Sequence, residues 1–139
     1  LINYPKSFDS YFSIVTLPNY GGNHDDFLDE KIWKPILSFQ PFVILGSKGF
    51  LKVLKSFGFQ TFFDLIDETY DEIEDDKVRW SKACMEIKRL SSKSLPELHS
   101  WYYSDDTQSK LKHNVHVAKK LSWNQIDRLS SLIKELDNI

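Results

Sequence analysis

The chain has 139 residues, a length that suits one domain and is too short for two of ordinary size. Its hydrophobic content of 41% excludes an intrinsically disordered chain, and a formal net charge of -2 excludes a general attraction to nucleic acid or anionic membranes. Cys84 is the only cysteine, which fits a reducing compartment, so we expect a cytoplasmic protein. No apolar run approaches the roughly 20 residues that span a bilayer, and the first residues lack the pattern of a signal peptide.

The chain begins with segments typical of a strand and a helix. Residues 11–17, YFSIVTL, are rich in aromatic and β-branched side chains and predict a buried strand. From about residue 26 to residue 39, Ile32, Ile36 and Phe39 recur at helical spacing, which predicts an amphipathic helix.

The same alternation continues along the chain. The apolar run FVILG at residues 42–46 predicts a strand covered on both faces. A helix follows, with Ser47 as its cap and Gly58 at its end, and residues 59–62 predict a short third strand. Strands that alternate with helices at these lengths predict right-handed βαβ units. We therefore expect an α/β fold, with a small Rossmann-like parallel sheet of three or more strands over residues 10–66.

The second half, residues 75–139, predicts helices only. One helix face carries Val78, Trp80, Ala83, Cys84, Ile87 and Leu90. Residues 95–103 and 123–136 predict two or three more helices, the last with a stripe of Ile126, Leu129, Leu132, Ile133 and Leu136. No linker separates the halves, so we expect residues 1–139 to form a single domain. The alternative is that the chain, which begins with Leu1, is the C-terminal half of a larger two-domain protein.

Charged residues gather at the start of the helix predicted for residues 26–39. Glu30 and Lys31 fall in its first turns, beside the carboxyl end of the sheet, where ligands bind in open α/β folds. A lysine there pairs with a phosphate and a glutamate accepts hydrogen bonds from sugar hydroxyls, so the pair suits a nucleotide sugar. Lys34 either shares that anion or pairs with Glu30. The simpler interpretation is a solvated helix surface bent by Pro35.

Two further segments lead to the same predicted edge. Ser47 lies in the loop GSKG, whose amides suit a phosphate, although the loop lacks the spacing of a P-loop and a tight turn is the simpler interpretation. Asp67 and Glu68 follow the predicted third strand and are weaker candidates for the site. With Asp71 they offer carboxylates to a divalent cation, but their spacing matches no calcium loop. We therefore predict no metal and no cofactor.

The block DEKIWKPILSFQPFVILGSKGFLKVLKSFGFQTF, followed by DETYDEIED, resembles the C-terminal part of glycosyltransferase-like proteins from phage and environmental sequences. The resemblance covers about residues 11–75, and the Glu-Lys segment is also similar to the donor-binding segment of α1,3-fucosyltransferases. It implies a GT-B arrangement, in which a C-terminal Rossmann-like domain holds a nucleotide-diphosphate sugar and an N-terminal domain holds the acceptor.

Carried over to this chain, the resemblance implies that Glu30 contacts the ribose or sugar and Lys31 the diphosphate. Lys34 belongs only to the phage-type pattern. The chain departs from that pattern at Asp29, where relatives have threonine, and at Lys48, where proline is usual. We expect the donor-binding domain of a hexosyl- or fucosyltransferase, inactive as this chain alone. The alternative is a non-catalytic protein-interaction domain on the same fold.

Overall fold

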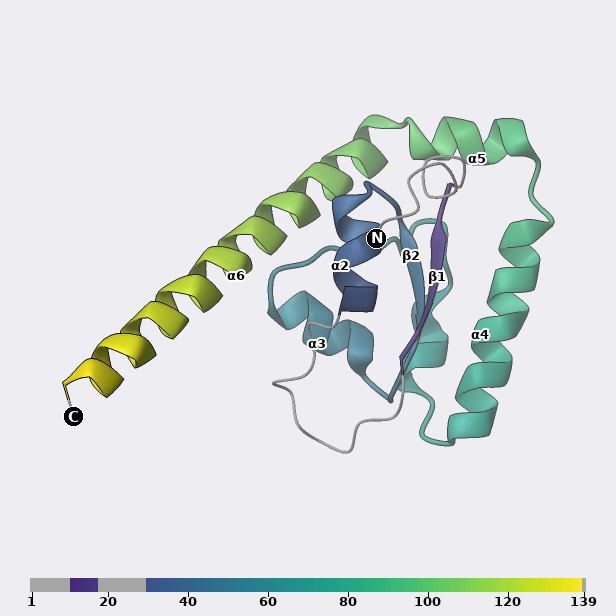
Figure 1. Ribbon diagram of the computed structural model, residues 1–139. Coiled ribbons are helices and arrows are strands. Elements are labelled where there is room, and N and C mark those ends of the chain that lie inside the picture. The colour runs from purple at the N-terminus through teal and green to yellow at the C-terminus, as the bar shows by residue number, and fades with distance from the viewer. Residues whose placement is uncertain (1–10, 18–29, 139) are drawn as a thin grey trace.

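The computed structural model describes residues 11–17 and 30–138 (Figure 1). Its elements in chain order are β1 (Ser13–Thr16), α2 (Glu30–Leu37), β2 (Phe42–Leu45), α3 (Phe50–Ser56), the 3-10 helix η2 (Glu68–Glu72), α4 (Asp76–Ser91), α5 (Leu95–Tyr102) and α6 (Asp105–Asp137). The α/β class is therefore confirmed, with strands confined to the first half and a helical second half.

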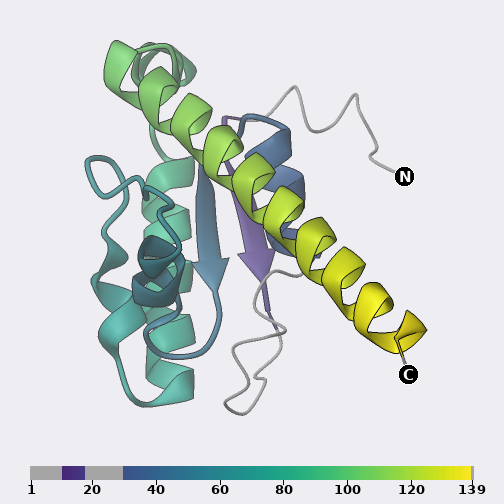
Figure 2. The ribbon, with the colours of Figure 1, turned by 90° about the vertical axis from the view of Figure 1, so that its left-hand side faces the viewer.

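The sheet consists of β1 and β2, which run parallel with Ser13 opposite Phe42 and Thr16 opposite Leu45. Helix α2 makes the crossover between them. Figures 1 and 2 show α2, α3 and α6 on one side of the sheet and α4 on the other. All four residues of β2 are buried, as expected for a strand with helices on both faces.

Helix α2 covers one face of the sheet with a regular apolar stripe. Ile32 and Ile36 are buried one turn apart, whereas Lys31 and Lys34 are exposed. Pro35 is buried and lies inside the helix, which continues past it to Leu37. This confirms the amphipathic helix predicted from the spacing, but the helix ends at Leu37, and Phe39 lies beyond it with φ 59. Residues 26–29 of that prediction lie outside the described residues.

The third strand predicted for residues 59–62 does not form, so the expectation of three or more strands is wrong for the described part of the chain. Tyr70 Oη donates to the carbonyl of Ile44 at 2.9 Å, on the side of β2 where that strand would pair. The amide and carbonyl of Gln60 instead bond to the side chain of Asn114, at 2.8 and 2.9 Å. Side chains thus replace the strand-to-strand hydrogen bonds.

The buried face of α4 differs from the predicted one. Ala83 and Leu90 are buried as expected, but Cys84 is exposed and is not a core residue. Arg79 and Glu86 are buried in its place. The face is rotated because both charged side chains find hydrogen-bond partners inside the fold.

The helices predicted for residues 95–103 and 123–136 both form, but the second is part of a longer helix. Helix α6 begins at Asp105, where the side chain of Ser104 caps it by accepting from the amide of Thr107. The segment contains neither glycine nor proline, so nothing interrupts it before Asp137. It packs against α2 and α5 and then extends beyond the other described elements (Figures 1 and 2).

Candidate functional site

The carboxyl ends of β1 and β2 lie at one edge of the sheet because the strands are parallel, and α2 and α3 both begin at that edge (Figure 1). Lys31 is exposed in the first turn of α2, and Lys34 is exposed one turn further on. Ser47 is exposed in the loop after β2 and does not cap α3 as predicted, because the N-cap of α3 is Gly49. Lys48 beside it pairs with an exposed glutamate. Glu30 opens α2, but its side chain lies outside the described residues.

The loop that follows β2 is held by groups of the chain itself. The amide of Gly49 donates to the carbonyl of Asp71 at 2.8 Å, and the amide of Leu51 donates to Asp71 Oδ2 at 3.0 Å. Gly49 adopts φ 76, a left-handed conformation that glycine accepts without strain. The carboxylate of Asp71 therefore lies at the start of α3, where the sequence suggested that backbone amides would meet a phosphate.

Arg79 fixes the same loop from the other side of the sheet. Its side chain is fully buried, with Nε donating to the carbonyl of Gly46 at 2.9 Å. Nη1 donates to the carbonyls of Ile73 and Glu74 at 2.9 and 3.2 Å. The burial of Arg79 was not predicted, because an arginine beside the apolar positions of an amphipathic helix gives no local sign of burial.

An open pocket of about 340 Å³ lies between α3 and the η2 segment. Leu51, Lys52 and Lys55 form its α3 side, and Glu68 and Asp71 are among the residues opposite. Lys55 Nζ lies 3.9 Å from Glu68 Oε1, and Lys52 pairs with a glutamate of η2 at 3.2 Å. The pocket therefore combines amines and carboxylates, which suits a polar ligand with both anionic and hydroxyl groups.

Burial controls the protonation of the two inner carboxyl groups. Burial raises the pKa of Glu68, and the hydrogen bond that it accepts from Thr61 Oγ1 at 2.7 Å opposes that rise only in part. Burial likewise raises the pKa of Asp71, against the hydrogen bond from Leu51. Both groups therefore hold a proton to a higher pH than exposed carboxylates do.

Asp67 has a structural role at this place. Its side chain caps η2 by accepting from the amide of Thr69 at 3.1 Å and from the Thr69 hydroxyl at 2.6 Å. These hydrogen bonds lower the pKa of Asp67. Among the side chains that the structure describes, no three acidic, histidine or cysteine groups converge as metal ligands, so the carboxylates Asp67, Glu68 and Asp71 do not form such a group.

Comparison with protein-family models, with curated proteins and with solved structures finds no match to the chain. In the described part of the chain, none of the helices combines the length and the apolar character that crossing a membrane requires.

Proposed function

We propose that the chain is the donor-binding domain of a GT-B-like glycosyltransferase and binds a nucleotide-diphosphate sugar at the carboxyl edge of its sheet. The observation that carries the proposal is the parallel β1–α2–β2 unit, since both following helices begin at one edge. Exposed Lys31 and Lys34 on α2 and exposed Ser47 after β2 accompany this edge. Edges of this kind bind phosphate-containing ligands in open α/β sheets.

Each residue has a distinct role in the proposal. Lys31 neutralises the diphosphate, together with the positive end of the α2 dipole, and stabilises it as the leaving group without a metal. Lys34 adds a second positive charge and Ser47 a hydroxyl donor. Glu30 accepts hydrogen bonds from the ribose or the sugar. Asp29, which precedes Glu30 in the sequence and lies outside the described residues, adds a negative charge that weakens the binding of phosphate.

The backbone amides at the start of α3 are already hydrogen-bonded, which excludes them as phosphate ligands. Because Asp71 already accepts from the amide of Leu51 and holds Gly49, these two amides do not serve the phosphate. The contacts are therefore assigned to side chains on α2 and to Ser47. Glu68 and Asp67 stay weaker candidates, on the neighbouring pocket wall. Transfer also needs an acceptor-binding N-terminal domain, so this chain alone binds the donor without turnover.

Calorimetric titration of GDP, UDP and their sugars tests the proposal. At least one of these ligands should bind, and Lys31→Ala should weaken its binding about tenfold, equivalent to about 1.4 kcal/mol. Ser47→Ala should weaken it less. Lys88→Ala, a lysine exposed near the far end of α4, is the matched control and should bind like the parent. Absence of binding, or equal affinities for the Lys31 and Lys88 variants, would contradict the proposal.

A protein-interaction domain is the second candidate. It is favoured by the small sheet, in which β1 pairs with β2 on one side and with no described strand on the other. An unpaired strand edge invites another strand. Size-exclusion chromatography with and without nucleotide separates the two candidates, because this one expects assembly that nucleotide does not change.

A further inference from the structure

The outer edge of β1 presents a regular row of backbone groups. The amides of Ser13 and Leu17 donate to Pro41 and Leu45 of the β2 segment at 2.8 and 2.9 Å. Because the groups of a strand alternate between its two sides, the amides and carbonyls of Ile14 and Thr16 point away from β2. No described strand pairs with them. Ile14 and Thr16 thus each direct one amide donor and one carbonyl acceptor outward from an extended backbone.

The two edges of the sheet differ in whether side chains satisfy or protect their backbone groups. On the β2 side, the hydroxyl of Tyr70 donates a hydrogen bond to the carbonyl of Ile44. On the β1 side, residues 11–17 contain no charged residue and no proline, which are two of the devices that keep a strand edge from pairing. An edge without charges or proline offers its backbone groups to another strand.

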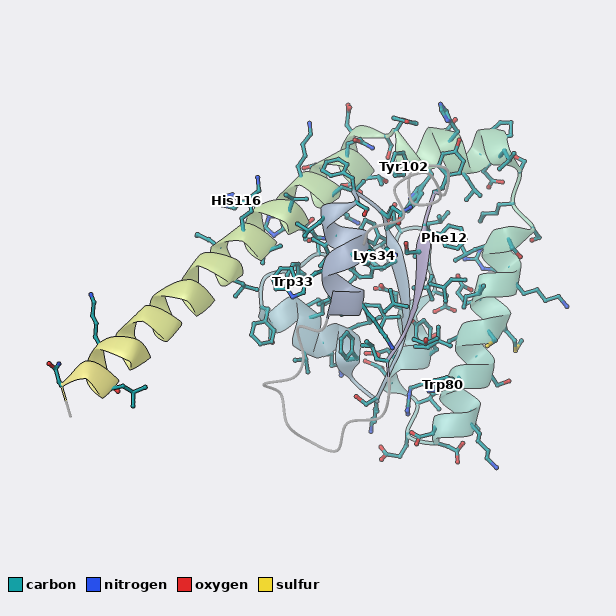
Figure 3. All side chains as sticks on the ribbon, in the orientation of Figure 1. Phe12, Trp33, Lys34, Trp80, Tyr102 and His116 are labelled. Atoms are coloured by element: carbon teal, nitrogen blue, oxygen red, sulfur yellow. The ribbon has the colours of Figure 1, made fainter. Side chains whose placement is uncertain are left out.

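Side chains at the β1 edge are also exposed on one face. Ile14 is 51% exposed and Thr16 is exposed, whereas Val15 is buried on the opposite face. Phe12 shares the face of Ile14 by alternation, and Figure 3 shows it on the side of the sheet that α4 flanks. A further strand beside β1 would bury Ile14 and satisfy the backbone row at once.

We propose that this strand is β1 of a second copy of the chain, paired antiparallel across a two-fold axis at Val15. In this register Ile14 lies opposite Thr16 of the partner subunit. Each such pair exchanges two hydrogen bonds, since both residues direct amide and carbonyl outward. The axis repeats the pair, so four hydrogen bonds form and no outward group of β1 within residues 14–16 is left unpaired.

A second copy fits this edge because the strand is complementary to itself. The antiparallel register places the exposed Ile14 side chain beside Thr16 of the partner subunit on the same face, a pairing of two β-branched residues. The strand carries no charge, so two copies do not repel each other there. The result is a continuous sheet in the order β2, β1, β1, β2. Nucleotide does not enter this pairing, which is independent of donor binding.

Sedimentation velocity over a range of protein concentrations tests the pairing, with Thr16→Pro as the first variant. The parent should show a monomer–dimer equilibrium. Thr16→Pro removes an outward amide and leaves the bonds to β2 in place, so it should weaken dimerisation at least tenfold. Ile14→Lys keeps every backbone group and should also weaken dimerisation. It replaces Thr16→Pro as the test if circular dichroism shows that the proline variant is unfolded. Met85→Lys replaces an apolar side chain that is exposed on α4 and should dimerise like the parent.

Amide hydrogen exchange locates the contact. In the dimer the amides of Ile14 and Thr16 should gain protection as concentration rises, whereas Val15, bonded within the subunit, should be protected throughout. A parent that stays monomeric at all concentrations overturns the proposal. So does a dimer that survives both variants, or one in which Ile14 and Thr16 exchange freely. Loss of dimerisation with donor binding intact in the same variants would support the pairing without bearing on the proposed function.

Discussion

At the scale of single residues, the fold buries the carboxyl groups of Glu68 and Asp71, and the nearby cations and hydrogen bonds only partly offset that burial. The nearest amine to Glu68 Oε1 among its ion pairs is Lys55 Nζ at 3.9 Å, and Asp71 Oδ2 is bonded to the amide of Leu51. In both cases burial is the main cause of a raised pKa. Such groups cost stability when they ionise, a pattern more common at ligand sites than in inert cores.

Glu68→Gln should therefore become more stable relative to the parent as pH rises from about 4 to about 7. The folded pKa of Glu68 lies above its ordinary value of 4.5, so in this range the folded parent binds more protons than the unfolded one. The contribution of Glu68 to the stability of the parent is therefore fully present at low pH and is lost as pH rises. Urea unfolding of both proteins across this range measures the difference.

The outcome for Glu68 is specific to a buried carboxyl group. Glu135→Gln removes an exposed carboxylate on α6 and controls for the change in net charge. The opposite result is that Glu68→Gln loses stability relative to the parent as pH rises from acidic to neutral. It would mean that the ion pair with Lys55 outweighs burial and that the pKa of Glu68 is not raised.

Asn114 holds the segment after α3 through its side chain alone. Asn114→Ala should lower the free energy of unfolding by about 1–3 kcal/mol, because the amide and carbonyl of Gln60 lose both partners. Asn138→Ala, at the exposed end of α6, should change it by less than about 0.5 kcal/mol. Denaturant midpoints of the two variants check this, and equal midpoints would show that water replaces Asn114 without cost.

At the scale of elements, Asp64 joins the segment after α3 to α5 and α6. Its carboxylate accepts from Trp101 Nε1 at 2.8 Å and from Lys110 Nζ at 3.2 Å. Burial alone would raise the pKa of Asp64, but the hydrogen bonds from Trp101 and Lys110 outweigh it, and the pKa falls below its ordinary value. The direction is opposite to that of Glu68 because a cation and an indole donor meet this carboxylate directly.

Asp64→Asn should therefore be less stable than the parent at neutral pH, and the difference should shrink as pH falls below about 4. A lowered folded pKa gives stability that is present above the ordinary value of 3.8 and lost as the pH falls through the folded value. Thermal unfolding at several pH values measures it. Trp101→Phe, which keeps an aromatic side chain but removes the indole N–H donor, should reproduce part of the loss. A difference that stays constant down to acidic pH would mean that packing, not charge, is responsible.

The elements that the sequence predicted well are those set by local patterns. Aromatic and β-branched content predicted β1, a continuous apolar run predicted β2, and the spacing of Ile32 and Ile36 predicted α2. The expected burial of β1 holds only in part, because Ile14 and Thr16 are exposed. The prediction of a third strand is wrong because the side chains that replace its pairing come from far along the chain: Asn114 lies 54 residues from Gln60, and Tyr70 lies 26 residues from Ile44. Such side-chain substitutes for strand pairing leave no periodic signal.

The same limit applies to the candidate site. The charges at the start of α2 could be placed at the sheet edge from the order of strands and helices. The occupied start of α3 could not, because Asp71 reaches Leu51 across 20 residues of sequence. Nor could the burial of Arg79, whose partner Gly46 lies 33 residues away. Long-range hydrogen bonds decide which groups of a loop remain for a ligand.

At the scale of the whole molecule, the α/β half and the helical half share their contacts. Helix α6 packs against α2, and Tyr102 Oη of α5 donates to the carbonyl of Phe39 at 2.7 Å. Leu90 of α4 is completely buried within the same core cluster as β2. A core shared in this way predicts one cooperative unit over the chain.

Leu90→Ala should accordingly destabilise both halves together, by about 2–5 kcal/mol, because the cavity lies in a core that the halves share. Hydrogen exchange under increasing denaturant measures the opening free energy of β2 and of α4 separately, and both should fall by the same amount. Met85→Ala, on the exposed side of α4, should leave both within about 0.5 kcal/mol of the parent. If β2 keeps its protection while α4 loses it, the halves are separate units that unfold independently, and the single-domain expectation fails.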